Sequence, residues 1–378
     1  MNGHNQSPVV NQQYQPQVPP AYQSNDEIDL RELFKALWDG KLIIITTTVL
    51  FAIGAVLFAL NSQEWWSSKA KVTQPQLQDM SAYQQQVRQF QPVFDIYQED
   101  GTVLVSGELD GLVDTQELFQ RFIDAFNSSD NKRSFLDSSE EFKKFKSELN
   151  ADAADDAELT RALYASWFSK IQANKDGNVA NSPFVVSFQS ISKESSYKLL
   201  SDYVTVIKHE THEDALNNLQ AIVSGKRNEL VQQRRLLETQ AKNRLAIEVE
   251  RAKYALDIAK AANVTHPIQT SSDKEIFGID LGSKALAAKV TALDSVKNLS
   301  VVEPRLQQID AKLEMLNNLE IDRSIEFQTF RFLENVEQPI ARDKPKRALI
   351  AVLGTLLGGM LGVAIVLVRI AFRREKAL

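Results

Sequence analysis

Cysteine is absent from the 378-residue chain, so disulfides, thiolate metal sites and thiol nucleophiles are excluded. Histidine is scarce, with four in the whole sequence, and no nucleophile–histidine–acid set or GxGxxG motif is visible. The net charge of -6 is the opposite of the basic balance typical of nucleic-acid binders. We therefore predict a protein that is not an enzyme, holds no cofactor and binds no nucleic acid.

Two short patterns come close to known site motifs without matching them. His209 and His212 lie three residues apart, whereas the HExxH motif places its histidines four apart, and two ligands make a poor metal site. Gly225-Lys226 lacks the upstream glycine of a phosphate loop. We expect a solvated helix face at the two histidines, and no metal site.

Charge is missing altogether from two long apolar runs, residues 42–60 and 348–368. As helices they would extend roughly 28 Å and 31 Å, which matches the hydrocarbon core of a bilayer. The first run begins too far from Met1 for an ordinary signal peptide. Both runs are therefore predicted to be retained transmembrane helices of an inner-membrane protein.

Lysine and arginine precede the first run and follow the second, which suits cytoplasmic tails at residues 1–41 and 369–378. Residues 61–347 then form a periplasmic domain, since a loop of this length crosses the membrane largely regardless of its charge. Residues 1–24 are rich in Gln, Asn and Pro, which predicts disorder. Apolar residues at helical spacing predict a short amphipathic helix before the first span: Leu30, Leu33, Phe34, Leu37 and Trp38.

The periplasmic domain is predicted to be α+β. Strands are expected at 67–73, 182–188 and 325–332, and helices at 118–126 and 197–207. Because the two spans bring the ends of the domain together, these strands should meet in one sheet. This membrane-proximal α/β base is assigned to residues 61–207 and 320–347.

Proline is absent between residues 208 and 264, and that segment contains a single glycine. It predicts one helix of roughly 85 Å, with later helices near 282–299 and 303–319. An apolar position recurs every seven residues from Leu216 to Leu237 and then stops at Arg244, so a two-stranded coiled coil is not predicted. Residues 208–319 are expected to form a long protruding stalk.

Glycines follow one another at four-residue steps in the second run, at Gly354, Gly358 and Gly362, with Gly359 adjacent. Such steps allow close approach of a second helix, here the first span, another copy or another membrane protein. The approach to this run combines prolines, which stop a strand, with basic residues that can reach lipid phosphates. Its candidate functional residues are Pro339, Arg342, Pro345, Lys346 and Arg347.

Several motifs occur in one order along the chain. They are Ile28-Asp29-Leu30, Leu37-Trp38, Trp66, Ser68, Ala70, Val72-Thr73, Phe188, Tyr203-Val204, Phe277-Gly278-Ile279-Asp280-Leu281-Gly282, Phe327, Phe330, the run from Pro339 to Ala348, and Gly358-Gly359. In this order the chain resembles the polysaccharide co-polymerases, the Wzz-type chain-length determinants of lipopolysaccharide O antigen. Only ten residues follow Val368, which favours the kinase-free class.

The resemblance implies a regulator of the modal length of a surface polysaccharide, most simply O antigen. It implies a ring-like homo-oligomer that acts on a separate membrane polymerase and its undecaprenyl-linked glycan. Alternatives are a regulator of enterobacterial common antigen or capsule, and a two-span periplasmic sensor or export-pump adaptor.

Overall fold

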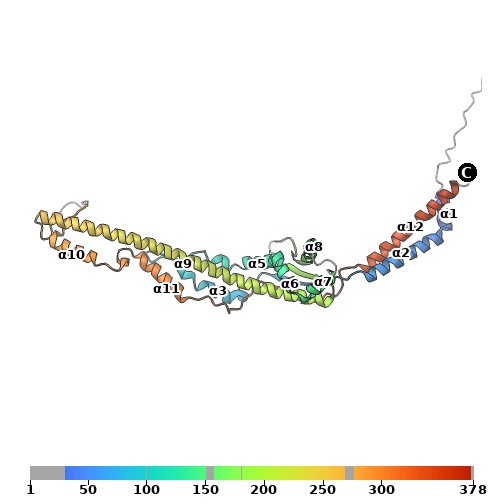
Figure 1. Cartoon of the computed structure of the whole chain (residues 1–378), viewed down its shortest axis with the longest axis horizontal. Helices are drawn as coiled ribbons and strands as arrows, with labels where there is room; N and C mark the ends of the chain where they lie inside the picture. The colour runs from blue at the N-terminus through green and yellow to red at the C-terminus, as the bar shows by residue number, and fades with distance from the viewer. Residues whose placement is uncertain (1–29, 99, 150–156, 180, 269–275, 376–378) are drawn as a thin grey trace, which may run out of the picture. The chain divides into compact units, whose positions relative to one another are not determined.

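A computed structural model describes residues 30–375 except 99, 150–156, 180 and 269–275 (Figure 1). The predicted disordered segment 1–24 lies outside the described residues. The chain divides into two compact units, one formed by residues 1–63 and 344–378, the other by residues 64–343. Each unit is described by itself.

The first unit consists of α1 (Leu30–Asp39), α2 (Lys41–Asn61) and α12 (Arg347–Glu375). Within it, Lys41–Asn61 and Arg347–Arg369 are long and apolar enough to cross a membrane. Helices α2 and α12 lie side by side (Figure 1), and α1 contacts α12. In α1 the side chains of Phe34 and Trp38 are exposed, as the amphipathic pattern predicts for a helix on a membrane surface.

The second unit contains a four-stranded antiparallel sheet in the order β4-β5-β1-β6. Its strands are β1 (Trp66–Thr73), β4 (Ile171–Lys175), β5 (Phe184–Ser190) and β6 (Arg331–Glu337). Strand β1 pairs with both β5 and β6, for example Ala70 with Val186 and Val72 with Phe332. The prediction that strands from both ends of the domain share one sheet is confirmed.

Helices cover this sheet and bury an aromatic core. They are α5 (Thr115–Asn127), α6 (Ser129–Ser138), α7 (Glu140–Leu149), α8 (Ala157–Phe168) and the first turns of α9. The side chain of Asp114 accepts hydrogen bonds from two backbone amides of the first turn of α5, as an N-cap should. Phe122 stacks on Phe330 with ring centroids 4.0 Å apart, and the Tyr203 hydroxyl donates to the Phe126 carbonyl at 2.8 Å.

Helix α9 (Lys193–Ala261) has 69 residues and extends roughly 100 Å at a rise of about 1.5 Å per residue. It joins the predicted helices 197–207 and 208–264 into one, because no helix-breaking residue stands between them. Helices α10 (Gly282–Asp294) and α11 (Arg305–Asn318) pack along it (Figure 1). The predicted mixed fold with one very long helix is thus confirmed.

Short elements fill the space beside α9 and α11. They are the 3-10 turns η1 (Leu77–Met80), η2 (Asp110–Leu112) and η3 (Leu299–Val301), the helices α3 (Ser81–Arg88) and α4 (Gln91–Phe94), and the strands β2 (Ile96–Tyr97) and β3 (Val103–Leu104). Strands β2 and β3 pair only with each other within the described chain. They form a small hairpin.

The predicted strand 325–332 is wrong for its first six residues, since β6 begins at Arg331. Residues 320–330, here called the strap, instead run along α9 and α3. The Ile325 carbonyl contacts His212 Nε2 at 2.8 Å, and the Gln328 amide donates to the Asp79 carbonyl at 2.9 Å. The alternation seen in the sequence reflects burial of every second side chain against helices, not pairing with another strand.

Candidate functional site

The glycine steps of α12 face α2. A Cβ atom placed on Gly358 would lie 2.7 Å from Phe51 Cβ and 2.9 Å from Thr48 Cα. At Gly362 it would lie 2.8 Å from Ile44 Cα, and at Gly354 it would meet Ala55. Carbon atoms normally stay about 3.5–4.0 Å apart, so only glycine fits at these positions.

Gly359 is different, because a Cβ there would meet only Thr48 Oγ1, at an ordinary 3.7 Å. Three of the four predicted glycines, Gly354, Gly358 and Gly362, therefore lie in close contact with α2, whereas Gly359 lies beside that contact. Whether other chains use the remaining faces of α12 stays a prediction.

Hydroxyl groups lie in the same contact. Thr47 Oγ1 donates to the Ile43 carbonyl at 2.9 Å, and Thr48 Oγ1 donates to the Ile44 carbonyl at 2.7 Å. These bonds to the preceding turn satisfy groups that would otherwise be costly in an apolar medium. The two spans can pack closely here without an unpaired hydroxyl at either threonine.

The predicted approach to the second span divides between the two units. In the second unit, Arg342 donates to Glu64 Oε1 at 2.9 Å and the Asp343 amide donates to the Trp65 carbonyl at 2.9 Å. Both ends of this unit are thereby held together. In the first unit, Arg347 Nε donates to the Ala59 carbonyl at 3.3 Å.

The other residues of this approach make fewer contacts. Pro339 and Pro345 are partly buried and Lys346 is exposed. The described contacts of Arg342 and Arg347 are with other protein groups. A role for Arg342, Lys346 and Arg347 at lipid phosphates stays a prediction.

The strap is fixed to α9 and α3 over its whole length. Arg323 donates to Glu213 at 3.0 Å and to Asn217 at 2.9 Å. The ring of Phe327 is buried between Tyr83, at 4.5 Å between centroids, and His212, at 4.3 Å. The strap therefore links the end of α11 to the sheet along the first third of α9.

His209 and His212, the two histidines considered as metal ligands, lie in different surroundings. The expected solvated face is found at His209, which is exposed on α9, but is wrong for His212, whose side chain is 18% exposed and lies in the strap contact. Among the described residues no group of three or more His, Cys, Asp or Glu side chains could hold a metal ion.

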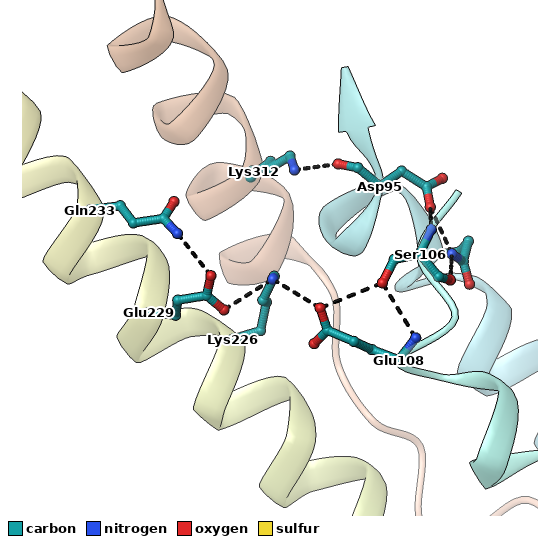
Figure 2. A network of polar contacts seen from close by, with 8 residues as sticks. Asp95, Ser106, Glu108, Lys226, Glu229, Gln233 and Lys312 are labelled. Carbon is teal, nitrogen blue, oxygen red and sulfur yellow. Dashed lines mark hydrogen bonds and ion pairs between the residues drawn. The ribbon is translucent and has the colours of Figure 1, made fainter. Parts of the chain in front are cut away.

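A polar network holds the root of the β2–β3 hairpin (Figure 2). Asp95 Oδ1 accepts from the Ser106 amide at 3.0 Å, which closes the hairpin at its base. Lys312 on α11 donates to the Asp95 carbonyl, and Lys226 on α9 pairs with Glu108 at 3.3 Å. The root is therefore tied to both long elements of the stalk.

Partial burial shapes the charges in this network. Burial lowers the pKa of Lys226, but hydrogen bonds and charges from Glu229 and Glu108 together outweigh burial and raise it. Burial lowers the pKa of Lys312, and the nearby charge of Lys226 lowers it further. Lys226, with 11% of its side chain exposed, is the better-paired cation of the two.

Sequence analysis missed this hairpin, although a signal was present. Asp100-Gly101 lies between two apolar runs, which is a typical hairpin turn pattern. Gly101 has φ +85°, a conformation that other residues rarely adopt. The Thr102 amide and hydroxyl both donate to Asp100 Oδ1, at 2.9 and 2.7 Å, and complete the turn.

Comparison with known proteins places these features in a family context. Residues 26–149 match the Wzz family, described as chain length determinant protein, and residues 305–371 match GNVR, a G-rich domain described on tyrosine kinases. A ferric enterobactin transport protein, FepE, of Escherichia coli (strain K12) is 27% identical over 376 residues, covering 96% of this chain and 94% of that protein. The ECA polysaccharide chain length modulation protein of the same strain is 26% identical over 359 residues, covering 93% and 97%.

A solved structure of a full-length bacterial polysaccharide co-polymerase has the same fold. Its TM-score is 0.58 at 24% identity, covering 93% of this chain and 100% of that chain. With the matches above, these findings confirm the resemblance drawn from the motifs. The chain is thus similar to Wzz chain length determinant proteins, through the family match at residues 26–149 and through relatives aligned over nearly its whole length.

Proposed function

We propose that this protein regulates the modal chain length of a surface polysaccharide, with lipopolysaccharide O antigen as the first candidate. One observation carries the proposal. The similarity to the ECA polysaccharide chain length modulation protein extends over 359 residues and covers 93% of this chain and 97% of that protein. A shared anchor alone would not account for a match of this extent.

The proposed topology places residues 64–343 in the periplasm and both termini in the cytoplasm. It is supported by the contacts that join the two ends of this unit, Arg342 to Glu64 and Asp343 to Trp65. A domain whose two ends meet can be held by two spans that return the chain to the same side. Lysine and arginine in the flanking tails favour the cytoplasm for those tails.

The mechanism proposed is that of a scaffold rather than a catalyst. Copies of the chain would assemble side by side and hold the membrane polymerase and its lipid-linked glycan for a set number of additions. Polar pairs such as Arg323 with Glu213 and Lys226 with Glu108 connect elements of the fold that are distant in sequence. They are placed to stiffen a long domain, which a scaffold requires.

A second candidate glycan is favoured by a specific observation, since one relative is named for ECA polysaccharide. The deciding experiment deletes the gene in its own host and compares three surface glycans with the wild type. Loss of the modal cluster from the O-antigen ladder alone would assign O antigen. Loss from the common-antigen or capsule profile alone would assign that glycan instead, and no change in any profile would refute length regulation in a strain without a second regulator.

A further inference from the structure

Both connections from the sheet to the candidate membrane helices leave at the same end of the sheet. Strands β1 and β4 begin there and β5 and β6 end there, as the pairing of Trp66 with Ser190 and of Lys69 with Glu337 shows. Helix α2 ends five residues before Trp66, and α12 begins seven residues after Ile340. Seven extended residues reach at most about 25 Å, so the chain ties this end of the sheet to the surface of a membrane that the two helices cross.

The loops at this end, here called the span-side end, carry no charge. They are residues 65–68, 190–192 and 338–341. Arg342 and Glu64, which flank two of these loops, pair with each other at 2.9 Å. By contrast, the loop between β4 and β5 at the opposite end of the sheet begins with Asp176. Uncharged loops suit a surface that borders lipid, because charged groups are costly there.

Two isoleucines are exposed at the span-side end. Ile340 is 97% exposed, and Ile191, in the turn between β5 and α9, is 37% exposed. The Asp343 amide donates to the Trp65 carbonyl at 2.9 Å, and the Asp343 carboxylate accepts from Gln189 Nε2 at 2.9 Å. These bonds hold the loop of Ile340 beside the turn of Ile191. Single exposed apolar residues are common on soluble surfaces, but these two share the end of the sheet that the chain ties to a membrane.

A tryptophan and a lysine lie at the same end. The Trp65 side chain is partly buried, and Lys170 Nζ lies 4.4 Å from the centroid of its ring and 5.7 Å from that of Trp167. Tryptophan is enriched where lipid meets water, because its ring is apolar and its N–H is polar. Lysine can keep its methylene groups on an apolar surface while its ammonium group reaches toward phosphates. Both residues therefore suit the level of lipid headgroups.

We propose that the span-side end of the domain rests on the lipid surface of the membrane that α2 and α12 cross, with the side chains of Ile340 and Ile191 inserted among the headgroups. This inference rests on the two-span topology of the proposed function, and it does not depend on which glycan is regulated. Apolar side chains that enter the headgroup region bind a surface without spanning the bilayer. The contact holds the domain at one angle to the membrane, which two connecting segments alone would not do.

The absence of cysteine allows a single label in the full-length protein. Ile340→Cys is labelled with the fluorophore NBD, and the protein is reconstituted into vesicles of phosphatidylethanolamine and phosphatidylglycerol. Quenching is measured with a phospholipid that carries a doxyl group on its acyl chain close to the headgroup, and separately with iodide on both sides of the vesicle. We expect strong quenching by the doxyl lipid and weak quenching by iodide.

The matched control is Val179→Cys, which is 72% exposed in the loop between β4 and β5 at the opposite end of the sheet. Its label should be quenched by iodide and not by the doxyl lipid. Equal doxyl quenching at residues 340 and 179 would overturn the proposal. A label at residue 340 that neither quencher reaches would also overturn it, because protein, such as a neighbouring copy, would then cover this end.

A second measurement leaves Ile340 free of the label, because NBD is itself apolar. The label is placed on Ile191→Cys, and Ile340→Asp is compared with Val179→Asp in that background. We expect Ile340→Asp to lower doxyl quenching at residue 191 several-fold and Val179→Asp to leave it unchanged. Equal quenching in the two variants would refute the insertion of Ile340.

The glycan profiles of the deletion strain are measured separately. Doxyl quenching at residue 340 together with unchanged glycan profiles would refute the proposed function and leave the lipid contact standing. Changed glycan profiles without doxyl quenching would refute the lipid contact alone.

Discussion

Alanine at Gly358 should separate the two spans, whereas alanine at Gly359 should not. The new Cβ at Gly358 would lie 2.7 Å from Phe51 Cβ. A normal carbon contact of about 3.5 Å requires the helices to part by roughly 0.8 Å, and a gap of about 0.5–1 Å forfeits a quarter to a half of the attraction between facing atoms. At Gly359 the nearest atom, Thr48 Oγ1, is already 3.7 Å away.

Overpacking of this kind destabilises by about 1–3 kcal/mol. The gain in helix propensity from glycine to alanine is about 1 kcal/mol, but both variants share it. The difference between Gly358→Ala and Gly359→Ala therefore isolates the contact. We expect the Gly358 variant to be less stable than the Gly359 variant by about 1–3 kcal/mol.

The assay uses a disulfide as the reporter of contact between the spans. A Cβ on Gly40 would lie 3.1 Å from Val366 Cβ, so Gly40→Cys with Val366→Cys should form a disulfide after slight adjustment. Disulfide formation is followed in detergent micelles while the fraction of sodium dodecyl sulfate is raised. A lower midpoint for Gly358→Ala than for Gly359→Ala is expected, and equal midpoints would refute the close packing of α12 on α2.

Three further predictions concern the second unit. Phe327→Ala removes a buried ring at the strap and should lower the free energy of unfolding by about 3–5 kcal/mol, read from urea denaturation of the full-length protein. Lys226→Met should speed hydrogen exchange of the amides in 96–106 by roughly tenfold to a hundredfold, because charged hydrogen bonds contribute about 1.5–3 kcal/mol. Lys253→Met, at an exposed ion pair, should leave this exchange unchanged. Burial raises the pKa of Tyr83 to about 12 from 10.0, so the stability it contributes is complete below pH 10 and is lost as the pH rises through 12. Tyr83→Phe should flatten that alkaline decline in the urea midpoint, and an unchanged decline would contradict this assignment.

The features that could be predicted are those set by local composition. Uncharged runs of bilayer length indicated α2 and α12, and the lack of proline between residues 208 and 264 indicated a long helix. The glycine steps could be found for the same reason, because small residues at four-residue spacing lie on one helix face. Their neighbour could not be chosen from the sequence, since a stripe of glycines does not identify the helix that covers it.

The features that were misread depend on distant partners. The alternation of residues 325–330 predicted a strand, yet Phe327 is buried against Tyr83 and His212, far away in sequence. Alternating burial is the same whether the neighbour is a strand or a helix. Similarly, the sequence predicts two helices, 197–207 and 208–264, where the structure has the single helix α9. The apolar residues of its first turns face the sheet, and those of later turns face α11.

The most direct test of length regulation separates the length of the glycan from its amount. The deletion strain is complemented with this gene or with an empty vector, and the ladder of the assigned glycan is compared on a gel at equal total polymer. We expect the modal cluster to return with the gene and a smooth decay of short chains to persist with the empty vector. A change in total polymer without any change in the distribution of lengths would contradict the account, because it would indicate a role in synthesis or export rather than in setting chain length.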